Sequence, residues 1–110
     1  MTVKELLESG LFEPVCTEGD QEREITGLYC CDLLSIAMGR APEGAAWVTV
    51  MSNMNTLAVA SLTEVACVIL AEGTTLDPAE TEKAKAQDII VLRTELPVFE
   101  AALSLHQKLS

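Results

Sequence analysis

The sequence is poor in basic residues, which limits the partners it can attract. Of its 110 residues, 7 are Lys or Arg and 17 are Asp or Glu, giving a formal net charge of -10. A chain this acidic repels phosphate backbones and anionic lipid. We therefore expect neither nucleic acid nor a membrane surface as a partner. Its apolar runs are also far shorter than the roughly 20 residues that a membrane span needs.

Aromatic residues are scarce as well, at 4% of the chain, while 49% of the residues are hydrophobic. The core must therefore be built mainly from Val, Leu, Ile, Ala and Met. Small side chains of this kind suit helices packed closely on a sheet. A chain of this length can bury a core of its own, so we expect residues 1–110 to form a single domain.

Paired CxxC spacings are absent, and the chain has one histidine. The four cysteines lie in apolar or extended segments, and nothing marks the chain for export, since MTVKELLESG lacks the apolar core of a signal peptide. We expect reduced structural thiols, no metal site and a cytoplasmic location. A thiol enzyme using Cys30 or Cys31 stays open as an alternative, although no general base accompanies them.

Other catalytic and cofactor motifs are missing too. No run of glycines could cradle a phosphate, and a single histidine, His106 in the last helix, cannot complete a triad with an oriented base. Arg40 and Arg93 are typical of surface arginines, with a phosphate site as the alternative reading. We expect no catalytic residue and no cofactor.

What the chain does contain is a regular pattern in residues 45–73. It predicts a buried strand at 47–51, a helix at 55–62 and a second buried strand at 66–70. Asp77, Pro78 and Glu80 then mark a helix start, and this helix is expected to last to residue 86. A strand at 89–92 follows, and a last helix carries one apolar stripe, made up of Val98, Phe99, Ala102, Leu105 and Leu109.

The first third of the chain is less regular. Thr2 and Glu5 fit a capping box that opens a short helix ended by Gly10. Residues 12–17 and 22–29 look extended around a polar turn, which predicts a hairpin or mixed strands, and Asp32 is placed to cap a helix closing at Gly39. The predicted fold class is α/β: a small three-layer sandwich with a mainly parallel sheet plus an added N-terminal hairpin or mixed strands.

Polar residues follow the expected parallel strands, where open α/β sheets usually bind ligands. Asn53 or Asn55 can cap the helix at 55–62, and a ligand or partner contact is the alternative for them. We expect polar residues to converge at this edge as one acidic, amide-bearing cleft, formed by Asp32, Asn53, Asn55, Glu72, Thr94 and Glu95.

The helix at residues 55–62 has apolar or small residues nearly all round. A helix without a polar face is buried on every side, and a second copy of the chain would cover it economically. We therefore expect a homodimer. The alternative is that residues 1–11 or the last helix supply the cover.

With these residues in place, the chain resembles the DRTGG domain family, and in particular its short stand-alone bacterial members. The resemblance covers most of the chain and rests on EITGLYCCDLLSIAMGRAPEGAAWVTV, SNMNTLAVASL, VACVILAEG and IIVLRTELPVFEAA. DRTGG domains accompany CBS domains in regulated pyrophosphatases, precede the catalytic part of some phosphotransacetylases, and are structurally similar to the N-terminal domain of HPr kinase. The resemblance implies a regulatory, scaffolding or dimerising module.

This sequence departs from the family at its name-giving motif. Asn53-Met54-Asn55 stands where the family has Asp-Arg, and Ala71-Glu72-Gly73 stands where it has Thr-Gly-Gly. An arginine and a glycine that would favour an anionic ligand are thereby lost. The expected function is a non-catalytic regulatory or protein-interaction module that contacts itself and another protein. The alternative is a sensor of a small molecule or metal at the C-terminal edge of the parallel strands.

Overall fold

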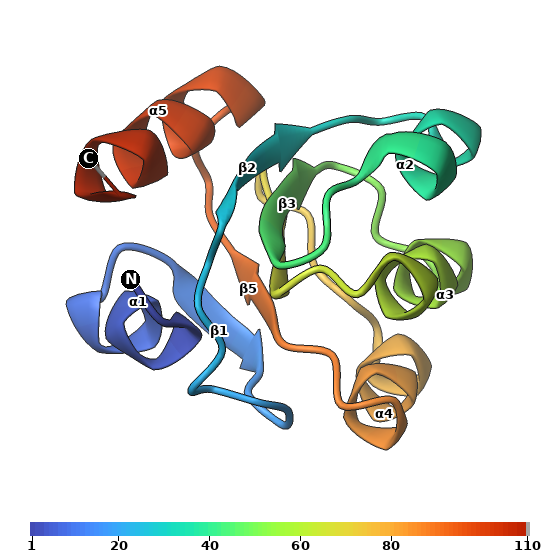
Figure 1. Ribbon diagram of the computed structural model, residues 1–110. Coiled ribbons are helices and arrows are strands. Elements are labelled where there is room, and N and C mark those ends of the chain that lie inside the picture. Colours follow the sequence, from blue (N-terminus) through green and yellow to red (C-terminus); the bar gives the residue numbers. More distant parts are fainter. Residues whose placement is uncertain (110) are drawn as a thin grey trace.

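The computed structural model describes residues 1–109, which form a five-stranded mixed sheet covered by helices on both faces (Figure 1). The elements in chain order are α1 (Val3–Ser9), β1 (Glu13–Cys16), β2 (Gly27–Cys30), α2 (Leu34–Arg40), β3 (Ala45–Thr49), α3 (Met54–Thr63), β4 (Cys67–Leu70), α4 (Pro78–Ala86), β5 (Val91–Arg93) and α5 (Val98–Leu109). The predicted α/β class with mixed strands is confirmed. Within these residues no helix has both the length and the hydropathy needed to cross a bilayer.

The strands lie in the order β1-β5-β4-β3-β2. Strands β2, β3, β4 and β5 are parallel, and β1 pairs with β5 in the antiparallel sense. The parallel strands therefore all end at the same edge of the sheet, as the sequence predicted. Strands β1 and β2 are the two outermost strands and share no pairing.

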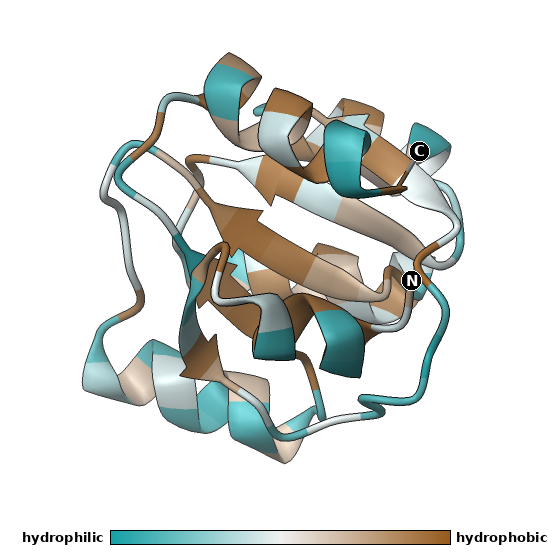
Figure 2. Ribbon diagram, turned by 90° about the vertical axis from the view of Figure 1, so that its left-hand side faces the viewer, coloured by the Kyte–Doolittle hydropathy of each residue, from teal (hydrophilic) through white to brown (hydrophobic). Residues whose placement is uncertain are grey.

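Each face of the sheet has its own hydrophobic core. Helices α1 and α5 cover one face, and α2, α3 and α4 cover the other (Figure 1). Side chains alternate between the two cores along β3, where Ala46 and Val48 face α1 and α5 while Trp47 faces α2 and α3. The strands are accordingly mostly hydrophobic, whereas the helices mix hydrophilic and hydrophobic residues (Figure 2).

Local sequence signals place several helix ends correctly. Both predicted capping boxes form: Thr2 with Glu5 at the start of α1, and Asp77 with Glu80 at the start of α4. Helix α1 ends at Gly10 in the left-handed conformation, and α4 ends at the predicted residue 86. The β3-α3-β4 unit falls within two residues of its predicted bounds.

The hairpin alternative for the N-terminal strands is wrong. Residues 17–26 carry the chain from the β1 edge to the β2 edge past the N-terminal ends of the strands between them. Arg23 Nη2 donates to the Glu64 carbonyl at 2.6 Å, and Thr26 N–H donates to the Gly44 carbonyl at 2.9 Å. The chain start joins this crossing through a bridge between Thr2 and Glu24. The extended segments therefore form opposite edges of one sheet.

Two details of the predicted helices also need correction. Helix α2 begins after Leu33 without a side-chain cap, because Asp32 binds elsewhere. In α5 the buried side includes Ala101 and Leu105, while Phe99, which the predicted stripe included, is 68% exposed. The inward side of α5 is therefore narrower than the sequence indicated.

Helix α3 is covered within the chain. Its residues Leu57, Val59 and Ala60 are buried, and α3 packs between α2 and α4 (Figure 1). Neither residues 1–11 nor the last helix supplies this cover, since α1 and α5 lie on the opposite face. The apolar character of α3 is thus explained without a second copy.

Candidate functional site

The C-terminal edge of the parallel strands begins, on the β2 side, with a polar contact made by Asp32. Its Oδ1 accepts hydrogen bonds from Thr49 Oγ1 at 2.8 Å and from Val50 N–H at 2.9 Å. Thr49 is fully buried at the end of β3, and its Oγ1 in turn accepts from Met51 N–H. Asp32 therefore fastens the turn after β2 to the end of β3.

The two asparagines of the next loop have different positions. Asn53 is the N-cap of α3, where its side chain accepts from Thr56 N–H at 3.1 Å. Asn55 lies in the first turn of α3 with its side chain exposed. The capping alternative is thus realised by Asn53.

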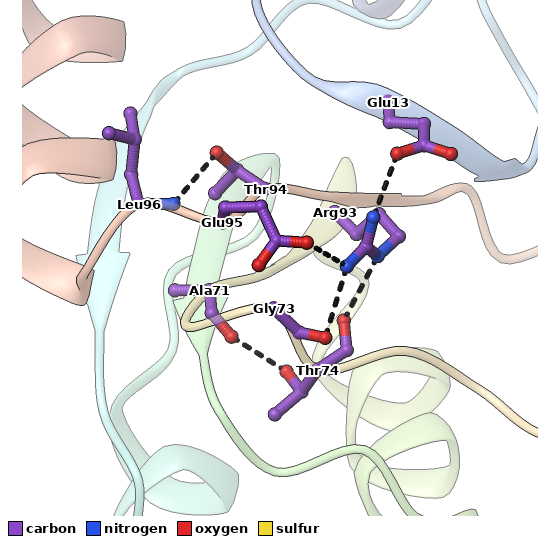
Figure 3. A network of polar contacts seen from close by, with 8 residues as sticks. All are labelled: Glu13, Ala71, Gly73, Thr74, Arg93, Thr94, Glu95 and Leu96. Carbon is purple, nitrogen blue, oxygen red and sulfur yellow. Dashed lines mark hydrogen bonds and ion pairs between the residues drawn. The ribbon is translucent and has the colours of Figure 1, made fainter.

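Arg93, at the end of β5, is the centre of the largest polar network at this edge (Figure 3). Its guanidinium bonds to Glu13 on β1 and to Glu95, each at 2.8 Å. It also donates to the carbonyl oxygens of Gly73 at 3.0 Å and Thr74 at 3.4 Å. The hydrogen bonds that Arg93 donates to the carboxylates of Glu95 and Glu13 raise the pKa of its guanidinium above the ordinary value.

The backbone donors of the β4–α4 loop are also used within the chain. Glu72 N–H donates to the Leu96 carbonyl at 2.8 Å, and Gly73 N–H donates to the Thr94 carbonyl at 2.9 Å. Both donors lie in a left-handed turn, with φ of 59° at Glu72 and 74° at Gly73. Successive N–H groups in such turns often bind anions, but here they join two loops of the chain.

The predicted site residues thus fall into separate groups. Glu72, Thr94 and Glu95 are brought together by the joined loops after β4 and β5. Asp32 binds the end of β3, while Asn53 binds its own helix.

Sequence reasoning treated Arg93 as a surface arginine and missed its role in this edge. Its main partner from β1, Glu13, is 80 positions away along the chain. The only signal was its position at the end of a strand.

The hydrogen bonds at this edge affect what it can bind. The side chain of Arg93 is 18% exposed and already faces two carboxylates. An anion would have to displace those carboxylates, and also the carbonyl groups that hold the two backbone N–H groups. The edge is therefore poorly suited to an anionic ligand.

The thiols differ sharply in environment. Burial raises the pKa of the Cys67 thiol on β4 to about 12. Burial and the nearby Asp32 carboxylate raise the pKa of Cys30, and burial also raises that of Cys16. All four cysteines are free. The raised pKa values of Cys16, Cys30 and Cys67 keep these three thiols protonated near neutral pH, which is opposite to the activation that a nucleophilic cysteine needs.

Two hollows of the structure lie away from this edge. One, of about 200 Å³, is at the N-terminal ends of β4 and β5 and is lined by polar groups that include Arg23, Glu64 and Gln87. The other is an apolar groove of about 300 Å³ between β2 and α5. Across the same residues no three His, Cys, Asp or Glu side chains gather closely enough to hold a metal ion.

These features define a small α/β domain whose parallel strands end in a largely self-satisfied polar edge. No protein-family sequence profile matches the chain, and no curated protein matches it at a significant level. The fold does match a solved structure: the CBS and DRTGG domains of the regulatory region of Clostridium perfringens pyrophosphatase, complexed with the activator diadenosine tetraphosphate.

The match has a TM-score of 0.69 at 16% sequence identity. It covers 93% of this chain and 44% of that one, so this chain spans less than half of the regulatory region. The expected likeness to a DRTGG-containing regulatory region is confirmed as a likeness of fold.

Proposed function

We propose that this chain is a regulatory or protein-interaction domain that carries no catalytic centre and works as a homodimer in the cytoplasm. The observation that carries the proposal is the fold, which matches the regulatory region of an enzyme over 93% of this chain. In the proposed role the domain changes the activity of a catalytic partner through contact. Such a role needs a stable surface and a second protein.

The chemistry of the polar edge supports the absence of catalysis. Its charged and amide groups hold loops together: Asp32 binds Thr49, Asn53 caps α3, and Arg93 is paired with carboxylates. The thiols of Cys30 and Cys67 have raised rather than lowered pKa values. A reacting group needs an oriented base or a lowered pKa. The side chains of this edge instead bind and hold other parts of the chain.

Sedimentation velocity across micromolar concentrations tests the dimer. We expect a concentration-dependent shift from monomer to dimer. A single monomeric species throughout would remove the homodimer from the proposal, while the regulatory role would then rest on a different partner.

The alternative function is a sensor of a neutral, cationic or metal-chelated ligand at the edge that contains Glu72, Thr94 and Glu95. The joined loops after β4 and β5 favour it, because their backbone hydrogen bonds bring together two segments that carry the exposed residues Glu72 and Glu95 in an acidic chain. The activator bound by the pyrophosphatase region is a dinucleotide polyphosphate. We propose that this chain does not bind such an anion at this edge, since its donors are occupied.

A thermal-shift panel of nucleotides, amino acids, polyamines and divalent ions separates the two functions. A ligand at about 100 times its dissociation constant adds roughly 2.7 kcal/mol to the free energy of unfolding, which is several degrees in a domain of this size. A shift with a cation or neutral compound would establish sensing. No shift with any compound would leave the interaction module as the function.

A further inference from the structure

Strand β2 leaves one side of the sheet open. It pairs with β3 on one side only and is the last strand in the order β1-β5-β4-β3-β2. Thr26 N–H points to β3, where it meets the Gly44 carbonyl. Since backbone groups alternate in direction along a strand, the N–H and C=O groups of Gly27 and Tyr29 point to the open side.

An apolar groove runs beside this open strand. It lies between β2 and α5, has a volume of about 300 Å³, and is lined by Leu28, Cys30, Phe99, Ala102, Leu103 and His106. Phe99 is 68% exposed and Leu103 is 40% exposed. Large side chains on this helix therefore stand in solvent next to unpaired backbone groups.

The other side of β2 continues this apolar character. Figure 1 shows β2 between α5 on one face of the sheet and α2 on the other. Just after β2, Leu33, Ile36 and Met38 are 55%, 46% and 45% exposed. Two helices beside the open edge, α5 on one face and α2 with its N-cap Leu33 on the other, thus expose large apolar side chains, a concentration that marks an interaction surface.

The β2 and α2 part of this region is almost free of charge, whereas the α5 part carries the exposed Glu100. Between Ile25 and Gly39 the only charged residue is Asp32, and its carboxylate is bound to Thr49 and Val50. The molecule as a whole carries a net charge of -10, so two copies repel each other through most faces. The open edge is the face through which they can approach with little repulsion.

We propose that the β2 edge and the β2–α5 groove are the surface through which two copies of this chain associate, with the β2 strands paired antiparallel about a two-fold axis. This inference rests on the homodimer of the proposed function and locates its interface. Antiparallel pairing of one strand with its own copy satisfies two-fold symmetry directly. Phe99 and Leu103 of each copy then pack beside the shared strands.

The available area suits such a dimer. Taking roughly 200 Å² for each large side chain, the five exposed residues named on α5 and around α2 offer about 500 Å² of apolar surface per copy. The backbone of β2 and the walls of the groove add to it. A standard interface buries about 800 Å² per partner, so this surface approaches what a stable dimer needs.

A charge placed on the surface tests this assignment, with a matched control elsewhere. Phe99→Glu introduces a carboxylate into the proposed interface, and Leu62→Glu makes the same kind of change at an equally exposed position, 68%, on α3. We expect Phe99→Glu to raise the dimer dissociation constant at least about 30-fold, as for a central interface residue. Leu62→Glu should leave it within about threefold. Thermal unfolding verifies that both variants fold.

Amide hydrogen exchange supplies an independent readout. In the wild type, exchange at Tyr29 should slow as protein concentration rises, and in Phe99→Glu this dependence should disappear. A dimer that Leu62→Glu breaks and Phe99→Glu leaves intact would overturn the assignment while keeping the homodimer. So would a dimer in which Tyr29 exchanges at the monomer rate. A wild type that stays monomeric overturns both and leaves the edge for an extended segment of another protein.

Discussion

Strands β1 and β2 are the two edges of one sheet, yet they are protected to different degrees. Strand β1 begins at Glu13, which forms an ion pair with Arg93, and it contains Pro14 with an irregular register after it. Strand β2 has no proline, no bulge in its pairing with β3 and no charged residue. Prolines, bulges and charges are the usual means by which proteins prevent sheets from pairing edge to edge.

The difference teaches where this domain can meet another chain. Strand β1 carries features that prevent another strand from pairing with it. Strand β2 instead has unpaired backbone groups beside the exposed Phe99 and Leu103, so another strand can pair with it. In the proposed dimer, the protection of β1 and the openness of β2 would direct association to one side of the sheet, which would limit it to pairs and prevent open-ended growth.

On the β2 side of the sheet, we expect the largest loss of stability from replacing Asp32, which joins the turn after β2 to the end of β3. Replacing it by Ala leaves the buried Thr49 hydroxyl and the Val50 N–H without their acceptor, and we expect a loss of about 2–3 kcal/mol in the free energy of unfolding. Asp32→Asn keeps an oxygen acceptor and should lose less than about 1 kcal/mol. Urea unfolding measures both. Equal losses for the two variants would contradict this account of Asp32.

Cys67, buried on the central strand β4, allows the interior of the sheet to be compared with its two edges. Burial raises its pKa in the folded chain from the ordinary 9.0 to about 12. Below pH 9 both states keep the proton and the stability is fully present. As the pH rises from about 9 towards 12, the unfolded chain releases its proton first and stability is lost.

We therefore expect the wild type to lose on the order of 1 kcal/mol more than Cys67→Ala between pH 7 and pH 10. Urea unfolding at the two pH values measures the difference. Cys30→Ala, at the exposed edge, is the control and should reproduce most of the wild-type loss. Identical pH profiles for the wild type and Cys67→Ala would show that the thiol is not protected by the fold.

The sequence predicted features that depend on neighbours along the chain. The capping boxes at Thr2 and Asp77 and the bounds of the β3-α3-β4 unit follow from residues within a few positions of one another. The errors come from distant partners. Asp32 looked like a helix cap because the competing Thr49 hydroxyl lies 17 positions away. The hairpin looked natural because the true partner of β1, strand β5, is encoded near the other end of the chain.

The candidate site was predictable in the same limited sense. The β-α-β pattern predicted that polar turns gather at the C-terminal ends of the strands. The pattern could not predict which of their residues touch, because Arg93 meets Glu13, Glu95 and two loop carbonyls only once the sheet has formed.

On the β1 side of the sheet, Arg93→Ala should lower the free energy of unfolding. The variant loses two ion pairs with well-exposed carboxylates, which contribute little because water screens them, and two hydrogen bonds to loop carbonyls. We expect a loss of about 1 kcal/mol in the free energy of unfolding, mainly from the carbonyl contacts. Arg40→Ala, an exposed arginine at the end of α2, should change it by less than about 0.5 kcal/mol. Matched losses for the two arginines would mean that the network does not secure this edge.

The smallest expected change in stability concerns Glu72, in the β4–α4 loop whose carbonyl groups Arg93 binds. Glu72 has φ of 59°, a conformation that costs an ordinary residue energy and suits glycine, and its side chain is exposed. Glu72→Gly removes that strain but adds freedom to the unfolded chain, so a net gain of about 0.5 kcal/mol is expected. Glu82→Gly, on the exposed side of α4, should instead lose about 1 kcal/mol.

The sign of the Glu72→Gly effect is informative, since the sequence resemblance to the DRTGG family aligns Glu72 with a glycine of its motif. A gain, measured by thermal unfolding, would mean that the turn suits glycine better than Glu and that Glu72 is accepted at a cost in stability. A loss would show that the Glu72 side chain contributes contacts of its own. In that case the β1 side would be secured by more than the Arg93 network and the two backbone hydrogen bonds that join its loops.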